Sequence, residues 1–109
     1  MPRKPTVSLD FDGVLAEYTG WRGKHHTGKP IAGALEFLTV YQRTHQFVIH
    51  SVREPEAISK WLIKHGFPAI PVTNVKPKAS AYIDDRAIRF DGDWLKVAEV
   101  LQIQPWWKS

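Results

Sequence analysis

Short, largely apolar runs alternate with longer amphipathic stretches along this chain. Thr6–Leu9, Phe47–Ile49 and Ala81–Ile83 are typical of strands buried in a sheet. A proline-broken run, Ala69–Val72, predicts one more short strand, and Ile88–Phe90 predicts an edge strand. The strands are therefore expected at intervals, with room for a helix between most of them.

Three stretches between or after these runs have helical spacing of their apolar residues. Ile31–Thr44 follows Pro30, which suits the start of a helix. A second helix is expected to begin near Glu54 and to end at Gly66. A third is expected to begin at the capping residue Asp93. The predicted apolar faces of the second and third helices are Ile58, Trp61, Leu62 and His65, and Trp94, Leu95, Val97, Ala98 and Leu101.

The order strand–helix–strand–helix–strand–strand–helix predicts an α/β fold. We expect a Rossmann-like, three-layer α/β/α arrangement with a mostly parallel central sheet. The 109 residues suffice for one domain, residues 1–109, and leave no room for a separate cap domain. Residues 13–30 are expected to form a loop rich in Gly, Lys and His.

Composition narrows the class of protein. The chain has no Cys, which excludes a disulfide framework and a thiolate metal site and fits the reducing cytoplasm. Asp10 and Asp12 interrupt the apolar run that a signal peptide would need, and no apolar run approaches the ~20 residues of a membrane span. The net charge of +4 favours an anionic partner, either a phosphorylated compound or nucleic acid.

The candidate chemistry begins in the segment DFDGVL, Asp10–Leu15. Its two carboxylates, Asp10 and Asp12, directly follow a predicted strand, and Gly13 allows a sharp turn. Two ionised carboxylates ~4 Å apart repel by about 4 kcal/mol at an effective dielectric constant near 20. Such a pair is retained to bind a cation, to transfer a proton, or where water screens the repulsion.

Other polar residues follow later predicted strands. They are Ser51, Lys76 or Lys78, and the acid pair Asp84–Asp85. Because the carboxyl ends of parallel strands share one edge of the sheet, we expect these groups to meet Asp10 and Asp12 there. Carboxylates favour a hard cation such as Mg²⁺, and a lysine with a hydroxyl suits phosphate oxygens.

These residues, in this order, resemble the four motifs of the haloacid dehalogenase superfamily of phosphohydrolases, over Thr6–Leu101. DFDGVL resembles the first motif, and Ser51, after FVIH, the second. Lys76 resembles the third, and Asp84–Asp85 the fourth. Lys76 is favoured over Lys78 because it precedes Pro77, as in the usual Lys-Pro of the family.

The resemblance implies a Mg²⁺-dependent phosphomonoester hydrolase with an aspartyl-phosphate intermediate. Asp10 would be the nucleophile and Asp12 the general acid and base. Ser51 and Lys76 would hold the phosphoryl group. Mg²⁺ would lie on Asp10, the Asp12 carbonyl and Asp84, with Asp85 beside it.

Family members usually carry a cap domain that selects the substrate, and this chain resembles a minimal, capless version with an open site. A weaker resemblance, through Ser51–Glu54 and Ile83–Arg86, is to the phosphatase domain of phage-type polynucleotide kinase. It implies that nucleotides or nucleic-acid 3′-phosphate ends are candidate substrates. Arg53 and Arg86 are then possible substrate contacts, and an ordinary surface or carboxylate-pairing role is the alternative.

Two other functions remain open from the residues alone. One is a phospho-accepting switch similar to a response-regulator receiver, although the order of the acidic motifs differs from that of receivers. The other is a non-catalytic nucleic-acid-binding module, suggested by the net charge of +4 and the aromatic and basic loop. Trp106 and Trp107 near the end of the chain suggest an oligomer contact as an alternative to packing on the core.

Overall fold

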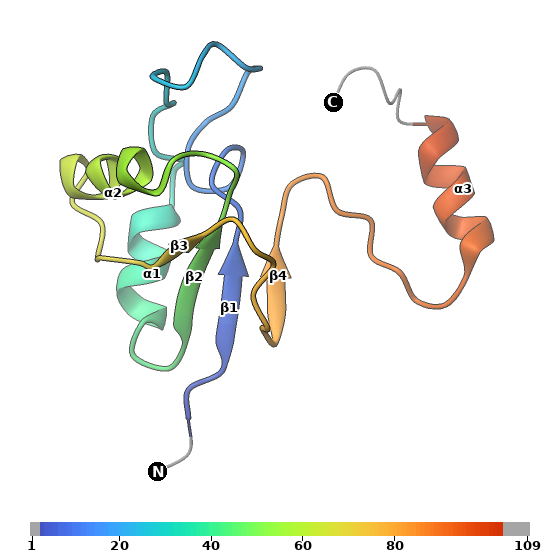
Figure 1. Cartoon of the computed structure of the whole chain (residues 1–109). Helices are drawn as coiled ribbons and strands as arrows, with labels where there is room; N and C mark the ends of the chain where they lie inside the picture. The colour runs from blue at the N-terminus through green and yellow to red at the C-terminus, as the bar shows by residue number, and fades with distance from the viewer. Residues whose placement is uncertain (1–2, 104–109) are drawn as a thin grey trace.

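The computed structural model describes residues 3–103. A four-stranded sheet with the order β3-β2-β1-β4 lies at its centre, and every neighbouring pair is parallel (Figure 1). The strands are β1 (Thr6–Leu9), β2 (Gln46–His50), β3 (Val72–Thr73) and β4 (Ala81–Ile83). The α/β class with a mostly parallel sheet, expected from the sequence, is thus confirmed.

One face of the sheet carries the core. The register pairs Leu9 with both Ile49 and Ile83, so these side chains project to the same face. Helices α1 (Ala34–Tyr41) and α2 (Pro55–Lys64) cover this face through one continuous cluster of buried side chains. Its largest fully buried members are Phe11, Leu9, Leu38, Ile49, Ile58 and Leu62.

The opposite face of the sheet is covered by a connection and not by a helix. Ser8 pairs with Val48 and Tyr82 in the register, so these three project away from the core. The Tyr82 hydroxyl donates to the Pro77 carbonyl at 2.7 Å, which places the segment between β3 and β4 beside this face. The segment between β3 and β4 therefore lies where a crossover helix would otherwise cover this face of the sheet.

The loop after β1 is closed at its base. Ala16 bridges Pro30, the Glu17 N–H donates to the Lys29 carbonyl at 2.7 Å, and the Ile31 N–H donates to the Leu15 carbonyl at 2.8 Å. These bonds form a neck from which residues 18–27 project. Pro30 consequently lies in this neck, so the first helix starts later than residue 31.

Several element boundaries differ from the sequence-based expectation, including that of the strand predicted over Ala69–Val72, and one predicted strand is missing. Helix α1 begins at Ala34, after Gly33 with φ of 91°, because residues 31–33 complete the loop. Strand β3 has two residues, since Pro68 and Pro71 leave few N–H donors around it. The edge strand predicted over residues 88–90 is wrong, because this segment runs away from the sheet within the connection to α3 (Figure 1).

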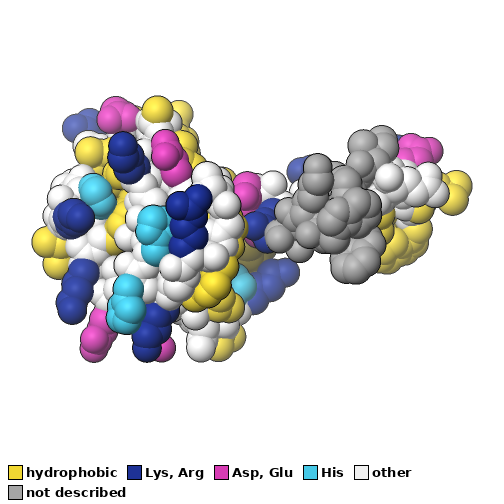
Figure 2. All heavy atoms as spheres, turned by 90° about the horizontal axis from the view of Figure 1, so that it is seen from above, with side chains coloured by type: hydrophobic (Ala, Val, Ile, Leu, Met, Phe, Trp, Pro, Cys, Tyr) yellow, Lys and Arg dark blue, Asp and Glu magenta, His cyan; other side chains and the backbone are white. Residues whose placement is uncertain are grey.

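Helix α3 (Trp94–Ile103) begins as predicted, since the Leu95 N–H donates to the Asp93 carboxylate at 2.9 Å. It stands apart from the sheet, however, as a separate lobe (Figures 1 and 2). Trp94, expected in the core, is 72% exposed, so α3 supplies no third layer here. Within residues 3–103, no helix has the length and apolar character needed to cross a membrane.

Candidate functional site

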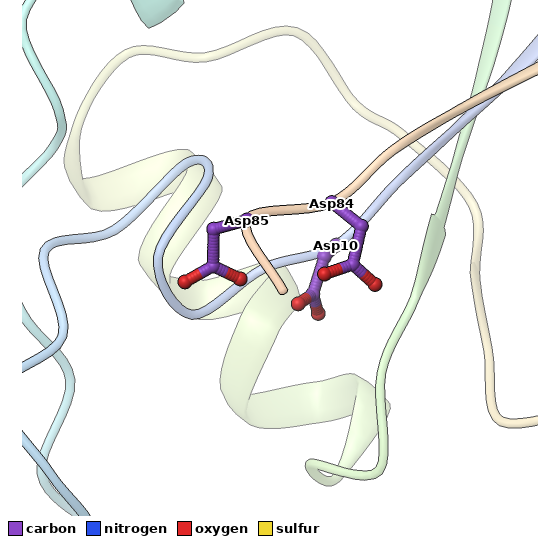
Figure 3. Close-up of side chains that lie close together, drawn as sticks. All are labelled: Asp10, Asp84 and Asp85. Carbon is purple, nitrogen blue, oxygen red and sulfur yellow. The ribbon is translucent and has the colours of Figure 1, made fainter. Parts of the chain in front are cut away.

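Three carboxylates meet at the carboxyl ends of the central strand β1 and the edge strand β4. The Asp10 N–H donates to the Ile83 carbonyl at 2.9 Å, which continues the pairing of these strands by one residue. Asp84 and Asp85 follow directly, and one oxygen from each of the three carboxylates lies within 4.8 Å of the others. Figure 3 shows the three side chains converging. The sequence-based expectation that these groups converge is therefore met.

The surroundings of Asp10 favour its protonated form. Burial raises the pKa of Asp10, and the carboxylates of Asp84, Asp85 and Asp12 raise this pKa further. The Phe11 N–H, which donates to the Asp10 carboxylate at 2.8 Å, opposes this effect. A cation among these oxygens would remove the repulsion and favour an ionised, nucleophilic Asp10.

Gly13 provides space for one of these acids. Its φ is 86°, a conformation that other residues rarely adopt, and a Cβ atom there would overlap the Asp85 carboxyl group. The turn after Asp12 thus brings the backbone directly against Asp85. The glycine of DFDGVL is therefore part of the acidic site as well as a turn residue.

Asp12 is held by an arginine. The Arg53 Nε–H donates to Asp12 Oδ2 at 2.7 Å, and an Arg53 Nη2–H donates to Asp12 Oδ1 at 3.1 Å. The Arg53 side chain is only 4% exposed, so this bidentate pair is largely screened from water. The Asp12 side chain lies outside the group of three carboxylates formed by Asp10, Asp84 and Asp85.

Ser51 directly follows β2, at the predicted sheet edge, and is buried. Its oxygen accepts a hydrogen bond from the Arg53 N–H at 3.1 Å, and its own N–H donates to the Thr73 carbonyl at 3.0 Å. The hydroxyl hydrogen is left to donate to a ligand, since its oxygen already serves as an acceptor. Ser51 can therefore offer a hydrogen bond to a phosphoryl oxygen.

One cavity of about 380 Å³ joins these groups. Two arginines on its lining lie against aromatic rings that also line it. The Arg53 guanidinium is 4.9 Å from the Trp21 ring centroid, and the Arg86 guanidinium is 5.4 Å from that of Tyr18. Its lining includes Ser8, Asp10, Asp12, Tyr18, Trp21, His50, Ser51, Arg53, Tyr82, Asp84 and Arg86.

The two lysines considered for phosphate binding lie elsewhere. Neither Lys76 nor Lys78 lines this cavity in the described part of the chain, and both are exposed. The Lys76 ammonium lies 4.8 Å from the ring centroid of Tyr82, a cavity residue, so it is close to the site without entering it. Trp106 and Trp107, the expected oligomer contact, lie outside the described residues.

The donor set fits a hard divalent cation. Asp10, Asp84 and Asp85 offer only carboxylate oxygens, which Mg²⁺ prefers, and they approach from two strand ends. Asp84 also accepts the Arg86 N–H at 2.8 Å, which orients its carboxylate. The site suits such a cation because its ligand atoms are carboxylate oxygens and because they lie close together.

Sequence reasoning missed two features of the site. The sequence left open whether Arg53 contacts substrate or pairs with a carboxylate, and it did not identify Asp12 as the partner. The hydrogen bond from the Trp61 indole N–H to the Gly28 carbonyl, 2.8 Å, was also missed. No local pattern signals either contact, because each joins segments at least 33 residues apart.

Comparison with known proteins supports the fold and names no activity. No family model matches the chain, and no curated protein matches it significantly. A solved structure described as a conserved protein from Bacteroides thetaiotaomicron is similar, with a TM-score of 0.63 and 26% sequence identity. The match covers 93% of this chain and 92% of that one, so the two chains share their architecture over nearly their whole lengths.

Proposed function

We propose that this protein is a Mg²⁺-dependent phosphomonoester hydrolase that forms an aspartyl-phosphate on Asp10. The observation that supports this most directly is the convergence of the Asp10, Asp84 and Asp85 carboxylates beside Asp12 and Ser51. This arrangement combines a nucleophile, a proton carrier, a hydroxyl donor and a cation site. Phosphoryl transfer depends on this kind of positioning and charge neutralisation.

In the first step, an Asp10 carboxylate oxygen attacks phosphorus and the bond from phosphorus to the leaving oxygen breaks. Asp12 gives its proton to that oxygen. In the second step, water attacks phosphorus, the bond to Asp10 breaks, and Asp12 takes the proton of the water. Ser51 donates to a phosphoryl oxygen. Asp10, Asp84 and Asp85 would hold Mg²⁺, which would supply charge neutralisation.

Arg53 is central to the use of Asp12. In this structure the guanidinium donates hydrogen bonds to both Asp12 carboxylate oxygens. For Asp12 to deliver a proton to the leaving oxygen, at least one of these hydrogen bonds must be given up. An anionic substrate that draws Arg53 toward itself would release Asp12 for that step.

The lining of the cavity favours a substrate that is both anionic and aromatic. Trp21 and Tyr18 offer ring faces, and Arg53 and Arg86 offer positive charge beside them. Bases of nucleotides stack on such rings, and phosphates pair with such cations. Nucleotides or nucleic-acid ends carrying a 3′-phosphate are therefore the first substrates to test, with Lys76 as a nearby additional cation.

The test is phosphate release with and without Mg²⁺. Wild-type protein should release phenolate from p-nitrophenyl phosphate when Mg²⁺ is present, and Asp10→Asn should abolish this release. Nucleotides, sugar phosphates and 3′- and 5′-phosphorylated oligonucleotides form the substrate panel. Asp93→Asn, which removes a half-buried carboxylate outside the site and leaves an amide that can still cap α3, is the matched control and should retain activity.

The outcomes separate the rival functions. Absence of turnover on every phosphomonoester would contradict the hydrolase proposal. A phosphorylated Asp10 that persists for minutes would instead favour a phospho-accepting switch. Salt-sensitive binding of single strands without any phosphate release would favour a nucleic-acid-binding module.

A further inference from the structure

Helix α3 exposes its apolar side to solvent. Trp94 is 72% exposed, Leu95 76% and Leu101 54%. The polar residues Lys96, Glu99 and Gln102 recur every three residues, which gives the helix one polar stripe and a broad apolar face. Figure 2 shows apolar side chains on the surface of this separate lobe. A helix of this pattern gains its stability by packing on an apolar surface.

The body of the same chain has an open apolar groove. It lies between α1 and β4, on the core face of the sheet, and has a volume of about 260 Å³. Phe37 and Ile83, on its two sides, are 42% and 39% exposed. All of its lining residues are apolar: Leu9, Val14, Leu15, Ile31, Ala32, Ala34, Phe37, Leu38 and Ile83. Parallel sheets are normally covered on both faces, so β4 lacks a helix here.

The chain exposes more surface than the average compact chain of the same mass. A compact chain of this mass exposes about 6,200 Å², whereas this chain exposes 8463 Å². The radius of gyration is 15.3 Å, against about 13 Å for a compact chain of this length. The excess surface, about 2,300 Å², corresponds to a missing set of contacts and not to a single exposed side chain.

We propose that two copies of this chain exchange α3, so that the helix of each copy lies in the groove of the other. The segment 84–93 follows β4 and carries α3 away from the sheet (Figure 1). Fully extended, ten residues span roughly 33 Å, which suffices to reach a neighbouring copy. If each copy recovers its excess surface, the pair buries about 4,600 Å², within the range of obligate homodimers.

Exchange of an identical element is a low-cost route to a dimer, because the contacts it makes are those the fold already requires. The start of α3 has contacts of its own that do not depend on the body. Lys96 pairs with Asp91 at 2.8 Å, and the Asp93 N–H donates to the Asp91 carboxylate at 3.2 Å. These local contacts hold the first turn of α3 wherever the helix packs.

The first measurement is the mass of the full chain in solution by sedimentation equilibrium at tens of micromolar. We expect twice the chain mass of 12.5 kDa. Leu101→Asp on α3 and Phe37→Asp in the groove should each shift the mass to that of one chain. Leu101 stands off the body, so its substitution does not threaten the folding of the sheet. Ile63→Asp, at an exposed position of α2, is the matched control and should remain dimeric.

Mixing the two variants distinguishes exchange from other dimers and from fold-back. Leu101→Asp chains keep an intact groove, and Phe37→Asp chains keep an intact helix. If the helices are exchanged, an equimolar mixture should form a dimer again. In that dimer the intact helix of the Phe37→Asp chain lies in the intact groove of the Leu101→Asp chain. A monomeric wild-type chain, or a mixture that stays monomeric when each variant alone is monomeric, would overturn the proposal.

Discussion

Asp10 is placed where its ionised form is least stable in the absence of a cation. Burial raises its pKa, and the carboxylates of Asp84, Asp85 and Asp12 act in the same direction. The folded protein therefore binds a proton at Asp10 more tightly than the unfolded chain does. This contribution to stability is present at low pH and is lost as the pH rises through the raised pKa.

The first prediction concerns stability without metal. Asp10→Asn should raise the thermal midpoint of metal-free protein at neutral pH, because the amide removes the buried charge. The gain should disappear below pH 3.8, the ordinary aspartate pKa, where the wild-type carboxyl is also neutral. Calorimetry across this pH range in a chelator is the measurement.

Asp91 provides a control, because its pKa is shifted in the opposite direction to that of Asp10. Its hydrogen bond with Lys96 lowers the pKa of Asp91, so ionisation of this carboxyl is favoured in the folded state. Asp91→Asn should therefore give no gain at neutral pH. If both variants raised the midpoint equally, a general reduction of negative charge would explain the effect better than the environment of Asp10.

A second residue-level prediction concerns Gly13. Gly13→Ala should reduce Mg²⁺ affinity by roughly tenfold or more, because the added methyl group displaces the Asp85 carboxyl and strains the turn by about 1 kcal/mol. Titration calorimetry with Mg²⁺ checks this. Gly20→Ala also changes a glycine of positive φ, but a Cβ there meets nothing within 4 Å, so it controls for backbone strain alone.

At this scale the sequence predicted which residues carry chemistry better than how they are paired. Asp10, Ser51, Asp84 and Asp85 end strands, so parallel pairing alone brings them to one edge. The side-chain direction of Arg53 depends on long-range contacts, and that of Lys76 depends on where β4 places Tyr82. Arg53 finds Asp12 and Trp21, whereas Lys76 lies against Tyr82, and neither choice is encoded locally.

At the scale of elements, α2 anchors the loop that borders the site. Trp61 is buried on α2, packs edge-on against Phe11 with centroids 4.9 Å apart, and donates its indole N–H to the Gly28 carbonyl. A Cβ at Gly28 would overlap the Glu17 carbonyl, so the two sides of the loop neck are in close contact. Trp61 therefore connects the core to the neck of the loop and fixes where the loop leaves the body.

This contact carries the element-level prediction. Trp61→Phe should lower the free energy of unfolding by about 1–3 kcal/mol, because the Gly28 carbonyl loses its donor and the core loses packing. Hydrogen exchange of the Lys29 and Glu17 amides should distinguish the two causes, since loosening of the neck accelerates the Glu17 amide in particular. Trp21→Phe, which changes an exposed indole, is the matched control.

The positions of elements with strong apolar periodicity were predicted correctly. Helix starts that depend on the conformation of the preceding turn were not. Ile58, Trp61 and Leu62 form the buried face of α2 as expected. The first helix was predicted to start three residues early, because Pro30 fits a helix start as well as it fits the neck bridge to Ala16. Helical spacing does not distinguish these two uses of proline.

At the scale of the whole molecule, the strand order explains why distant motifs meet. β1 lies at the centre with β2 on one side and β4 on the other, so Asp10 has Ser51 and Asp84 as neighbours across the sheet. The position of α3 could not be predicted in this way. Its apolar pattern indicates that it packs against something, but the pattern is the same whether the groove belongs to its own chain or to a second copy.

The neck formed by Ala16, Glu17, Lys29 and Pro30 has a consequence for how new specificity could arise on this scaffold. The two ends of the loop are hydrogen-bonded to each other. The neck therefore presents the same backbone to the core, whatever sequence lies between its two sides. Doubling the length of such a loop costs only about 0.6 kcal/mol in closure entropy. Residues 18–27 thus form an exchangeable module, in which a longer insert could grow into a lid while the acidic centre stays unchanged.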